Sequence, residues 1–106
     1  MSILVLDCGS SALKATVFAD DGAVIATADA GYPAAATAHR RAPEDWWRAV
    51  VEAVGRLPRE GVSALSLTGM MENLIAVDAL GEPVRDAVLY SDPIGTEAFD
   101  AVAARL

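Results

Sequence analysis

The stretch Asp7–Lys14, with the sequence DCGSSALK, contains the residue types best suited to chemistry. Asp7 follows a short apolar run, so its carboxylate comes at the end of a buried strand. The Gly-Ser-Ser segment after it can aim backbone N–H groups into one concavity that suits phosphate oxygens. Lys14 adds positive charge, and Asp7 suits Mg²⁺, which takes one or two carboxylates and keeps several waters. The alternative is an ordinary hairpin, in which Asp and Ser only form the turn.

A second polar segment, Gly69–Asn73, follows another expected strand. Ligands of open α/β sheets bind beyond the carboxyl ends of parallel strands. Glu72 and the asparagine beside it have side chains that hydrogen-bond a polyol. The alternative is a solvent-exposed loop with Met70 or Met71 in the core. Asp92 has the same two interpretations.

The remaining reactive side chains favour structural roles. Cys8 lacks a neighbouring basic residue that would make it a reactive thiolate, which predicts a small core residue. His39 has no partner at metal-binding spacing, which predicts a surface histidine. Arg40–Arg41 is expected to be solvated, with a role in a substrate lid left open. Trp46–Trp47 is expected to anchor a helix to a sheet.

The composition excludes several classes of protein. The 106 residues suit one domain, and 54% hydrophobic content excludes a disordered acidic tail. A net charge of −7 argues against nucleic-acid binding, which needs a basic face. No apolar stretch approaches the ~18 residues of a membrane span, and the start lacks the features of a signal peptide. A single cysteine fits a reducing compartment, so we expect a cytoplasmic protein.

Three strands are predicted around the first polar segment. Ile3–Leu6 is a buried strand, whereas the alternation in Ala12–Ala19 and Ala23–Ala30 is typical of half-buried strands. The Gly-Ser-Ser and Asp-Asp-Gly segments between them favour tight turns. The result is a three-stranded antiparallel meander.

The second half of the chain is predicted to add a helix and a parallel strand. Pro43 suits the first position of a helix that ends at Leu57, before a proline. Its apolar stripe is expected to comprise Trp46, Trp47, Val50, Val51, Val54 and Leu57. The remaining expectations are a loop over Gly31–Ala42, a strand Val62–Thr68 parallel to the first, a small hairpin from Leu74–Val77 to Ala87–Tyr90, and a helix Thr96–Leu106.

These segments resemble, in order and spacing, the FGGY carbohydrate kinases, and most of all the xylulokinase branch. The resemblance covers nearly the whole chain. The matching segments are Asp7–Lys14, the Asp20-Asp21-Gly22 turn, Ala42–Trp47, Thr68–Glu72, Leu74–Asp78, Gly81-Glu82-Pro83 and Leu89–Asp92.

The resemblance implies an α/β fold of the ribonuclease-H-like (actin-like ATPase) type. It implies that residues 1–106 are the first portion of the N-terminal domain, and that the rest of that domain and the C-terminal domain are not in this chain. It further implies transfer of the ATP γ-phosphate, with Mg²⁺, to a sugar or polyol hydroxyl. Asp7 is then the metal-side carboxylate, and the first phosphate loop contains Gly9, Ser10, Ser11 and Lys14. The catalytic base is an aspartate outside these residues, so the 106 residues alone are expected to be inactive.

The substrate site implied by the resemblance contains Met71, Glu72 and Asp92. Xylulokinases usually have Gly-Gln-Met-His where this chain has Gly-Met-Met-Glu, so Glu72 replaces a substrate-contacting histidine. Glycerol kinases have a glutamate at the matching position, which keeps polyol binding plausible. The family often has tryptophan at Tyr90 and Asp-x-Arg at Asp92, whose arginine partner is absent from this motif.

Other functions stay open on sequence alone. The altered substrate loop motivates a non-catalytic, sugar-binding or regulatory relative with the same fold. Another actin-like ATPase would share the first hairpin but lack the Pro-Glu-Asp-Trp-Trp and Gly-Glu-Pro segments. A fold without a ligand is the third alternative. We also expect the isolated chain to expose apolar surface and to associate, as a homodimer or loosely.

Overall fold

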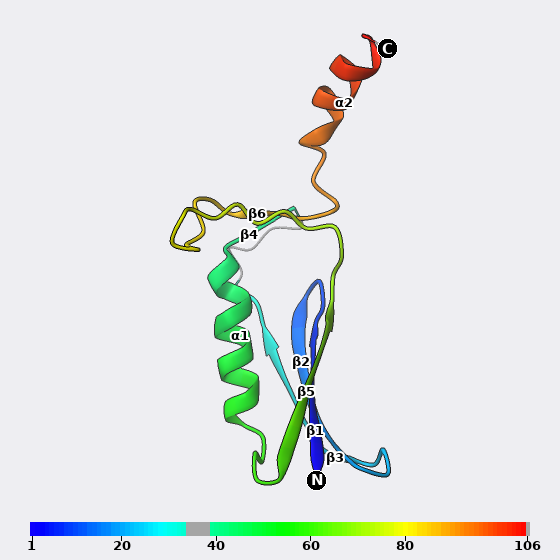
Figure 1. The fold of residues 1–106 in the computed structure, drawn as a ribbon, viewed down its shortest axis with the longest axis vertical. Helices are drawn as coiled ribbons and strands as arrows, with labels where there is room; N and C mark the ends of the chain where they lie inside the picture. The colour runs from blue at the N-terminus through cyan, green and yellow to red at the C-terminus, as the bar shows by residue number, and fades with distance from the viewer. Residues whose placement is uncertain (34–38, 106) are drawn as a thin grey trace.

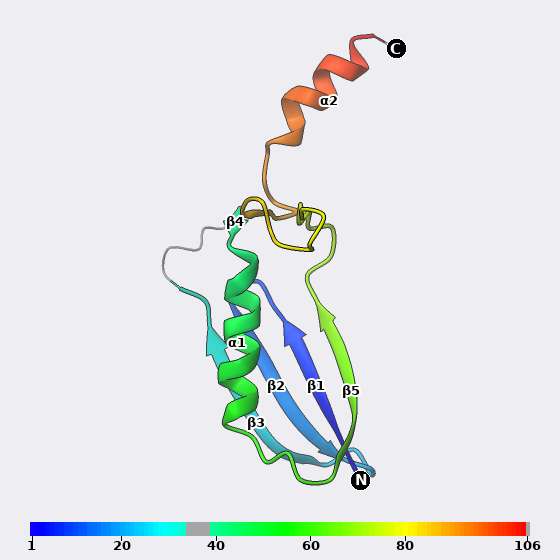
Figure 2. The ribbon, with the colours of Figure 1, turned by 60° about the vertical axis from the view of Figure 1, so that its left-hand side comes forward.

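A four-stranded sheet forms the centre of the computed structural model, which describes residues 1–33 and 39–105. The strands β1 (Ser2–Cys8), β2 (Ala12–Ala19) and β3 (Val24–Gly31) form an antiparallel meander. β5 (Val62–Gly69) lies parallel to β1, so the order is β3-β2-β1-β5 (Figures 1 and 2). The predicted meander and the parallel crossover strand are therefore confirmed.

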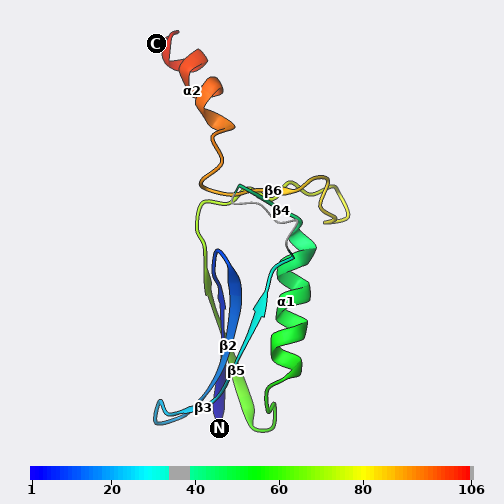
Figure 3. The ribbon, with the colours of Figure 1, turned by 180° about the vertical axis from the view of Figure 1, so that it is seen from behind.

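The helix α1 (Pro43–Gly55) covers one face of the sheet over β2 and β3 (Figures 2 and 3). Its buried residues are Asp45, Ala49 and Ala53, which follow one another at helical spacing. The two alanines face the sheet because their short side chains allow a close approach. Trp46 is half-buried, but Trp47 is 70% exposed, so the predicted double anchor is wrong. Trp47 lies about 200° around the helix from the buried Asp45, so it points away from the sheet.

The hydrophobic core lies between α1 and the meander. It contains Leu6, Leu13, Ala15, Val17, Ala30, Ala49, Ala53 and Leu57. Side chains on one face of a strand recur at every second residue, so β1 places Leu4, Leu6 and Cys8 toward α1 and Asp7 on the opposite face.

A second, two-stranded sheet lies beyond the carboxyl ends of β1 and β5. It pairs β4 (Arg40–Arg41) with β6 (Ala87–Val88), both two residues long (Figure 1). β4 falls within the predicted loop 31–42, of which residues 34–38, including the alanine run, lie outside the described residues.

The predicted hairpin between residues 74 and 90 contains fewer paired residues than expected. Leu74 pairs with Val88 and Val77 pairs with Pro83, each through a single bridge, so Leu74–Val77 is not a strand. Leu74 and Val77 are both more than half exposed. This apolar run therefore gains little burial that would stabilise a longer strand pairing.

The second predicted helix is present as α2 (Gly95–Ala103), and it extends away from the sheet (Figure 1). Its apolar residues Phe99 and Val102 are exposed, while Leu106 lies outside the described residues. β5 likewise has Leu65 and Leu67 more than half exposed on the face toward α1. The expected apolar surface is therefore present, whereas association through it stays a prediction. No helix in the described part of the chain is long and apolar enough to cross a membrane.

Candidate functional site

The β1–β2 turn (Gly9–Ser11) and Cys8 before it are held by hydrogen bonds from three different segments. The backbone amide of Met70 donates to the carbonyl oxygen of Cys8 at 3.2 Å. The Tyr32 hydroxyl donates to the Gly9 carbonyl at 3.1 Å, and Arg41 Nη2 donates to the Ser10 carbonyl at 2.9 Å. The carbonyl groups around the turn are thus bound by the protein itself.

The other polar groups of the turn are available to a ligand. Ser10 and Ser11 are exposed, and among the described residues neither donates a backbone hydrogen bond. Gly9 permits this shape because a Cβ there would lie 3.0 Å from the carbonyl oxygen of Ala12. Two amides and two hydroxyls in one short turn are donors that suit the oxygens of a phosphate.

Asp7 and Lys14 lie opposite each other on neighbouring strands, just before this turn. The register pairs Asp7 with Lys14 of β2 and with Thr68 of β5, on the face of the sheet away from α1. Among residues 1–33 and 39–105, no group of three His, Cys, Asp or Glu side chains could hold a metal ion. The donor set is one exposed carboxylate, which fits Mg²⁺ because that ion keeps several waters and uses phosphate oxygens as ligands.

A cavity of about 340 Å³ opens beside the β1–β2 turn. It is lined by Ser10, Ser11, His39, Met70, Leu89, Tyr90 and Ser91. His39 Nδ1 and Ser91 Oγ are hydrogen-bonded at 3.3 Å, so the loops that precede β4 and α2 meet at its wall. His39 is exposed, as expected, but it also lines this cavity. The volume suits a small hydroxylated ligand.

Asn73 joins the two loops that form this cavity. Its Nδ2 donates to the Met70 carbonyl at 3.3 Å, and its Oδ1 accepts from the Tyr90 amide at 3.2 Å. The sequence-based hypothesis assigned this amide to a polyol. In the structure both ends of the side chain bind the backbone, so Asn73 shapes the cavity.

The predicted substrate residues lie outside that cavity. Met71 is 75% exposed, and Glu72 is exposed with a φ of 61°, in the left-handed region. Asp92 forms an ion pair with Arg40, and both line a neighbouring cavity of about 540 Å³. The structure thus brings the two serines of the turn together with the Tyr90–Ser91 loop, but not with Met71, Glu72 or Asp92.

Arg41 is buried, with 5% of its surface exposed, so the prediction of a solvated arginine pair is wrong at this position. Its guanidinium carbon lies 3.7 Å from the centroid of the Tyr32 ring and 5.6 Å from that of Trp46. Burial raises the pKa of the Tyr32 phenol, and negative charge at Cys8 adds to this effect, although Arg41 opposes it. The phenol therefore keeps the proton that it donates to Gly9.

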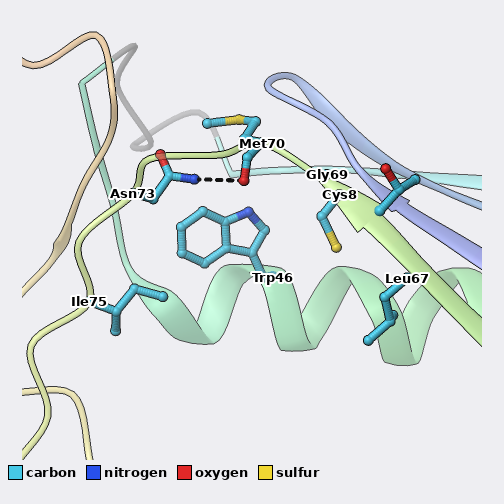
Figure 4. Close-up of a pocket in the computed structure, with 8 residues that line it drawn as sticks. Cys8, Trp46, Leu67, Gly69, Met70, Asn73 and Ile75 are labelled. Atoms are coloured by element: carbon cyan, nitrogen blue, oxygen red, sulfur yellow. Dashed lines mark hydrogen bonds between the residues drawn. The ribbon is translucent and has the colours of Figure 1, made fainter.

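A third cavity, of about 330 Å³, separates β5 from the start of α1 (Figure 4). Its lining contains Cys8, Trp46, Leu67, Thr68, Gly69, Met70, Asn73 and Ile75. Burial raises the pKa of the Cys8 thiol and the Asp7 carboxylate raises it further, which fits the predicted unreactive cysteine. This cavity is mainly apolar and the turn cavity holds more hydrogen-bonding groups, so the turn cavity is the candidate site for a hydroxylated ligand.

Sequence reasoning missed Tyr32 and Arg41 as parts of the site. Neither belongs to a motif with a known spacing, and both reach the turn only through the tertiary fold. The pair of adjacent arginines was the available signal in the sequence. It did not show that Arg41 is buried and that Arg40 forms an ion pair.

Known proteins resemble this chain in sequence and in fold. Residues 2–105 match the FGGY family of carbohydrate kinases, N-terminal domain. The chain is 35% identical over 95 residues to a xylulose kinase of Streptomyces coelicolor and 28% identical over 98 residues to a gluconokinase of Bacillus subtilis. Each match covers 85% of this chain but only 20% and 19% of the relative, so the chain spans about a fifth of their length.

The fold is also that of a solved relative. The crystal structure of a xylulose kinase from Bifidobacterium adolescentis superposes with a TM-score of 0.84 at 25% identity, over 95% of this chain and 20% of that one. The family match extends over nearly every described residue and includes the β1–β2 turn. The chain belongs to the FGGY family of carbohydrate kinases.

Proposed function

We propose that this chain forms part of an enzyme that transfers the γ-phosphate of ATP to a hydroxyl of a sugar or polyol. The observation that carries this proposal is the shared cavity. Ser10 and Ser11, whose donors suit phosphate oxygens, line it together with the Tyr90–Ser91 loop. A hydroxylated ligand there would lie next to a phosphate held by the turn, as phosphoryl transfer between two bound substrates requires.

Phosphoryl transfer depends mainly on positioning and on stabilisation of charge. The Ser10 and Ser11 amides and hydroxyls bind phosphate oxygens, and Lys14 contributes positive charge. Asp7 would hold a hydrated Mg²⁺, which would supply positive charge next to the phosphates.

Glu72 and Asp92 are proposed to orient the acceptor. Charge-assisted hydrogen bonds from sugar hydroxyls to carboxylates have the strength and direction for this role. Glu72 is exposed in the loop after β5, one residue beyond Met71, and Met70 of the same loop lines the turn cavity. A cytoplasmic location fits the unpaired Cys8.

The test is an acceptor panel with the full-length protein. Pentuloses, hexuloses, polyols and gluconate are each supplied with Mg-ATP, and ADP release is measured. We expect acceptor-dependent ADP release with at least one member of the panel. Tight sugar binding by calorimetry without ADP release from any acceptor would instead establish the non-catalytic relative. Absence of both ATP binding and sugar binding would refute the assignment to either role.

A further inference from the structure

We propose that Arg41, stacked on Tyr32, is a positioning residue that holds the β1–β2 turn in its phosphate-binding conformation. This inference rests on the proposed function of the turn. Arg41 belongs to β4 and Tyr32 follows β3, so both reach the turn from outside its own hairpin. Together they bind the carbonyls of Gly9 and Ser10, at 3.1 and 2.9 Å.

The two hydrogen bonds constrain the part of the turn that a ligand would use. A peptide plane has its carbonyl and its amide on opposite sides. Fixing the Gly9 carbonyl therefore fixes the Ser10 amide, and fixing the Ser10 carbonyl fixes the Ser11 amide. These are the two amides that donate no backbone hydrogen bond within the described part of the chain. Arg41 and Tyr32 thus set the direction of both donors without contacting the ligand.

The charge of Arg41 is a second argument for an anion at the turn. Its Nε and Nη1 are buried and have no hydrogen-bond partner among residues 1–33 and 39–105, and no ion pair of these residues includes it. A buried cation without a neutralising anion is costly. Stacking on Tyr32 offsets part of this cost, and a phosphate bound at Ser10 and Ser11 would offset more.

The test compares R41M, R41K and wild type in the full-length protein. Hydrogen exchange is followed in the peptide that spans Cys8–Leu13, and ATP and sugar affinities are measured by calorimetry. R41M should speed exchange in that peptide and weaken ATP binding about tenfold, equal to ~1.4 kcal/mol. Sugar affinity should fall less, because Ser10 and Ser11 form only part of the wall of the sugar cavity. R41K should lose less ATP affinity because lysine retains the charge, although it lacks the planar, bidentate guanidinium.

Arg56 provides a matched control. Its Nη1 donates to the Asp29 carbonyl at 2.9 Å, the same type of bond that Arg41 makes, at an exposed site outside the turn. R56M should leave both ATP affinity and exchange in Cys8–Leu13 unchanged. Y32F keeps the ring under Arg41 but removes the bond to Gly9, so it should produce a smaller change in the same direction as R41M.

The outcomes separate the two proposals. Wild-type exchange in Cys8–Leu13 of folded R41M would overturn the role of Arg41, as would unchanged ATP affinity in R41M. If R41M does not fold, Y32F and R41K take its place, and wild-type exchange and ATP affinity in both would overturn the role. A wild-type protein that binds no ATP would refute the function proposed for the turn, whereas faster exchange in R41M would still support Arg41 as the residue that holds it.

Discussion

The carboxylate of Asp92 forms an ion pair with Arg40, which ties β4 to the loop before α2. The Asp92 side chain is only 6% exposed, and its Oδ1 also accepts a hydrogen bond from the Ile94 amide at 2.8 Å. The family's usual Asp-x-Arg motif is incomplete in this sequence. Arg40 supplies a cation to the carboxylate from a distant part of the chain.

Replacing Arg40 with alanine should therefore destabilise the protein. The substitution leaves a nearly buried carboxylate without its cation, and we expect a loss of about 1–3 kcal/mol in the free energy of unfolding. Urea denaturation provides the measurement. E52A is the control, because the Glu52–Arg56 pair lies at the surface and should contribute only about 0.3–0.5 kcal/mol. Equal losses in the two variants would contradict a structural role for the Arg40–Asp92 pair.

Asp7→Asn should remove activity without unfolding the full-length protein. Asp7 is exposed, so its loss costs little packing, but the proposed metal site loses the one carboxylate that the described residues give it. We expect turnover with Mg-ATP to fall by at least about 100-fold. Asp29→Asn is the matched control, since Asp29 faces the same Lys14 from β3. Normal turnover in Asp7→Asn would exclude the metal role.

Glu72 combines backbone strain with a proposed role in binding. A non-glycine residue at a φ of 61° is strained, so Glu72→Gly should stabilise the protein by about 1 kcal/mol. The same change removes a carboxylate from the acceptor site and should raise the sugar KM about tenfold. Glu72→Asn, which tolerates this backbone conformation, should raise KM with less gain in stability. Unchanged sugar dependence in both variants would remove Glu72 from the acceptor site.

Gly69 is required where β5 approaches β1. A Cβ at this position would lie 2.8 Å from the Cys8 carbonyl oxygen and 2.9 Å from the Cys8 Cβ. Gly69→Ala should thus force the two strands apart and cost roughly 1–3 kcal/mol in urea denaturation. Gly31→Ala, where nothing lies within 4 Å of the added atom, should be close to neutral. A neutral effect of Gly69→Ala would show that the strands can separate there without loss.

Because the pKa of Cys8 is raised in the folded protein, we expect the free energy of unfolding to fall at alkaline pH. The folded protein keeps the thiol proton to higher pH than the unfolded chain does. Below the ordinary thiol pKa, Cys8 makes its full contribution to the free energy of unfolding. This contribution is lost as the pH rises through the folded-state pKa, because the thiol of the unfolded chain ionises first. Urea denaturation at stepped alkaline pH should show this decline. Cys8→Ala should reduce it, and an identical decline in the variant would assign the effect to other groups.

The main strands follow from local patterns. Alternating side chains in β2 and β3, and the turns between them, predict the meander without knowledge of distant contacts. The face of α1 that packs against the sheet was harder to predict. Large apolar residues dominate the sequence pattern, whereas the small residues Ala49 and Ala53 are the ones buried against the sheet. Hydrophobicity alone does not show which side of an amphipathic helix benefits from small residues.

The site was predictable only in part. Ser10 and Ser11 follow from turn chemistry, whereas the sequence pointed to Asp92 and not to Tyr90 and Ser91, which line the turn cavity. The burial of Arg41 depends on Tyr32 and on the Ser10 carbonyl, which only the folded chain brings together. The pairing of β4 with β6 could not be predicted from local sequence patterns either, because a strand of two residues is too short to show an alternation of side chains.

The three donors that bind the carbonyls of Cys8, Gly9 and Ser10 come from segments far apart in the sequence, so the turn has all its hydrogen bonds only when those segments have docked. A hairpin formed early would lack the bonds from Met70, Tyr32 and Arg41. Affinity for a nucleotide would then arise only once β4 and the end of β5 have docked. Bound nucleotide should consequently shift the unfolding equilibrium of this whole unit, and not of the hairpin alone.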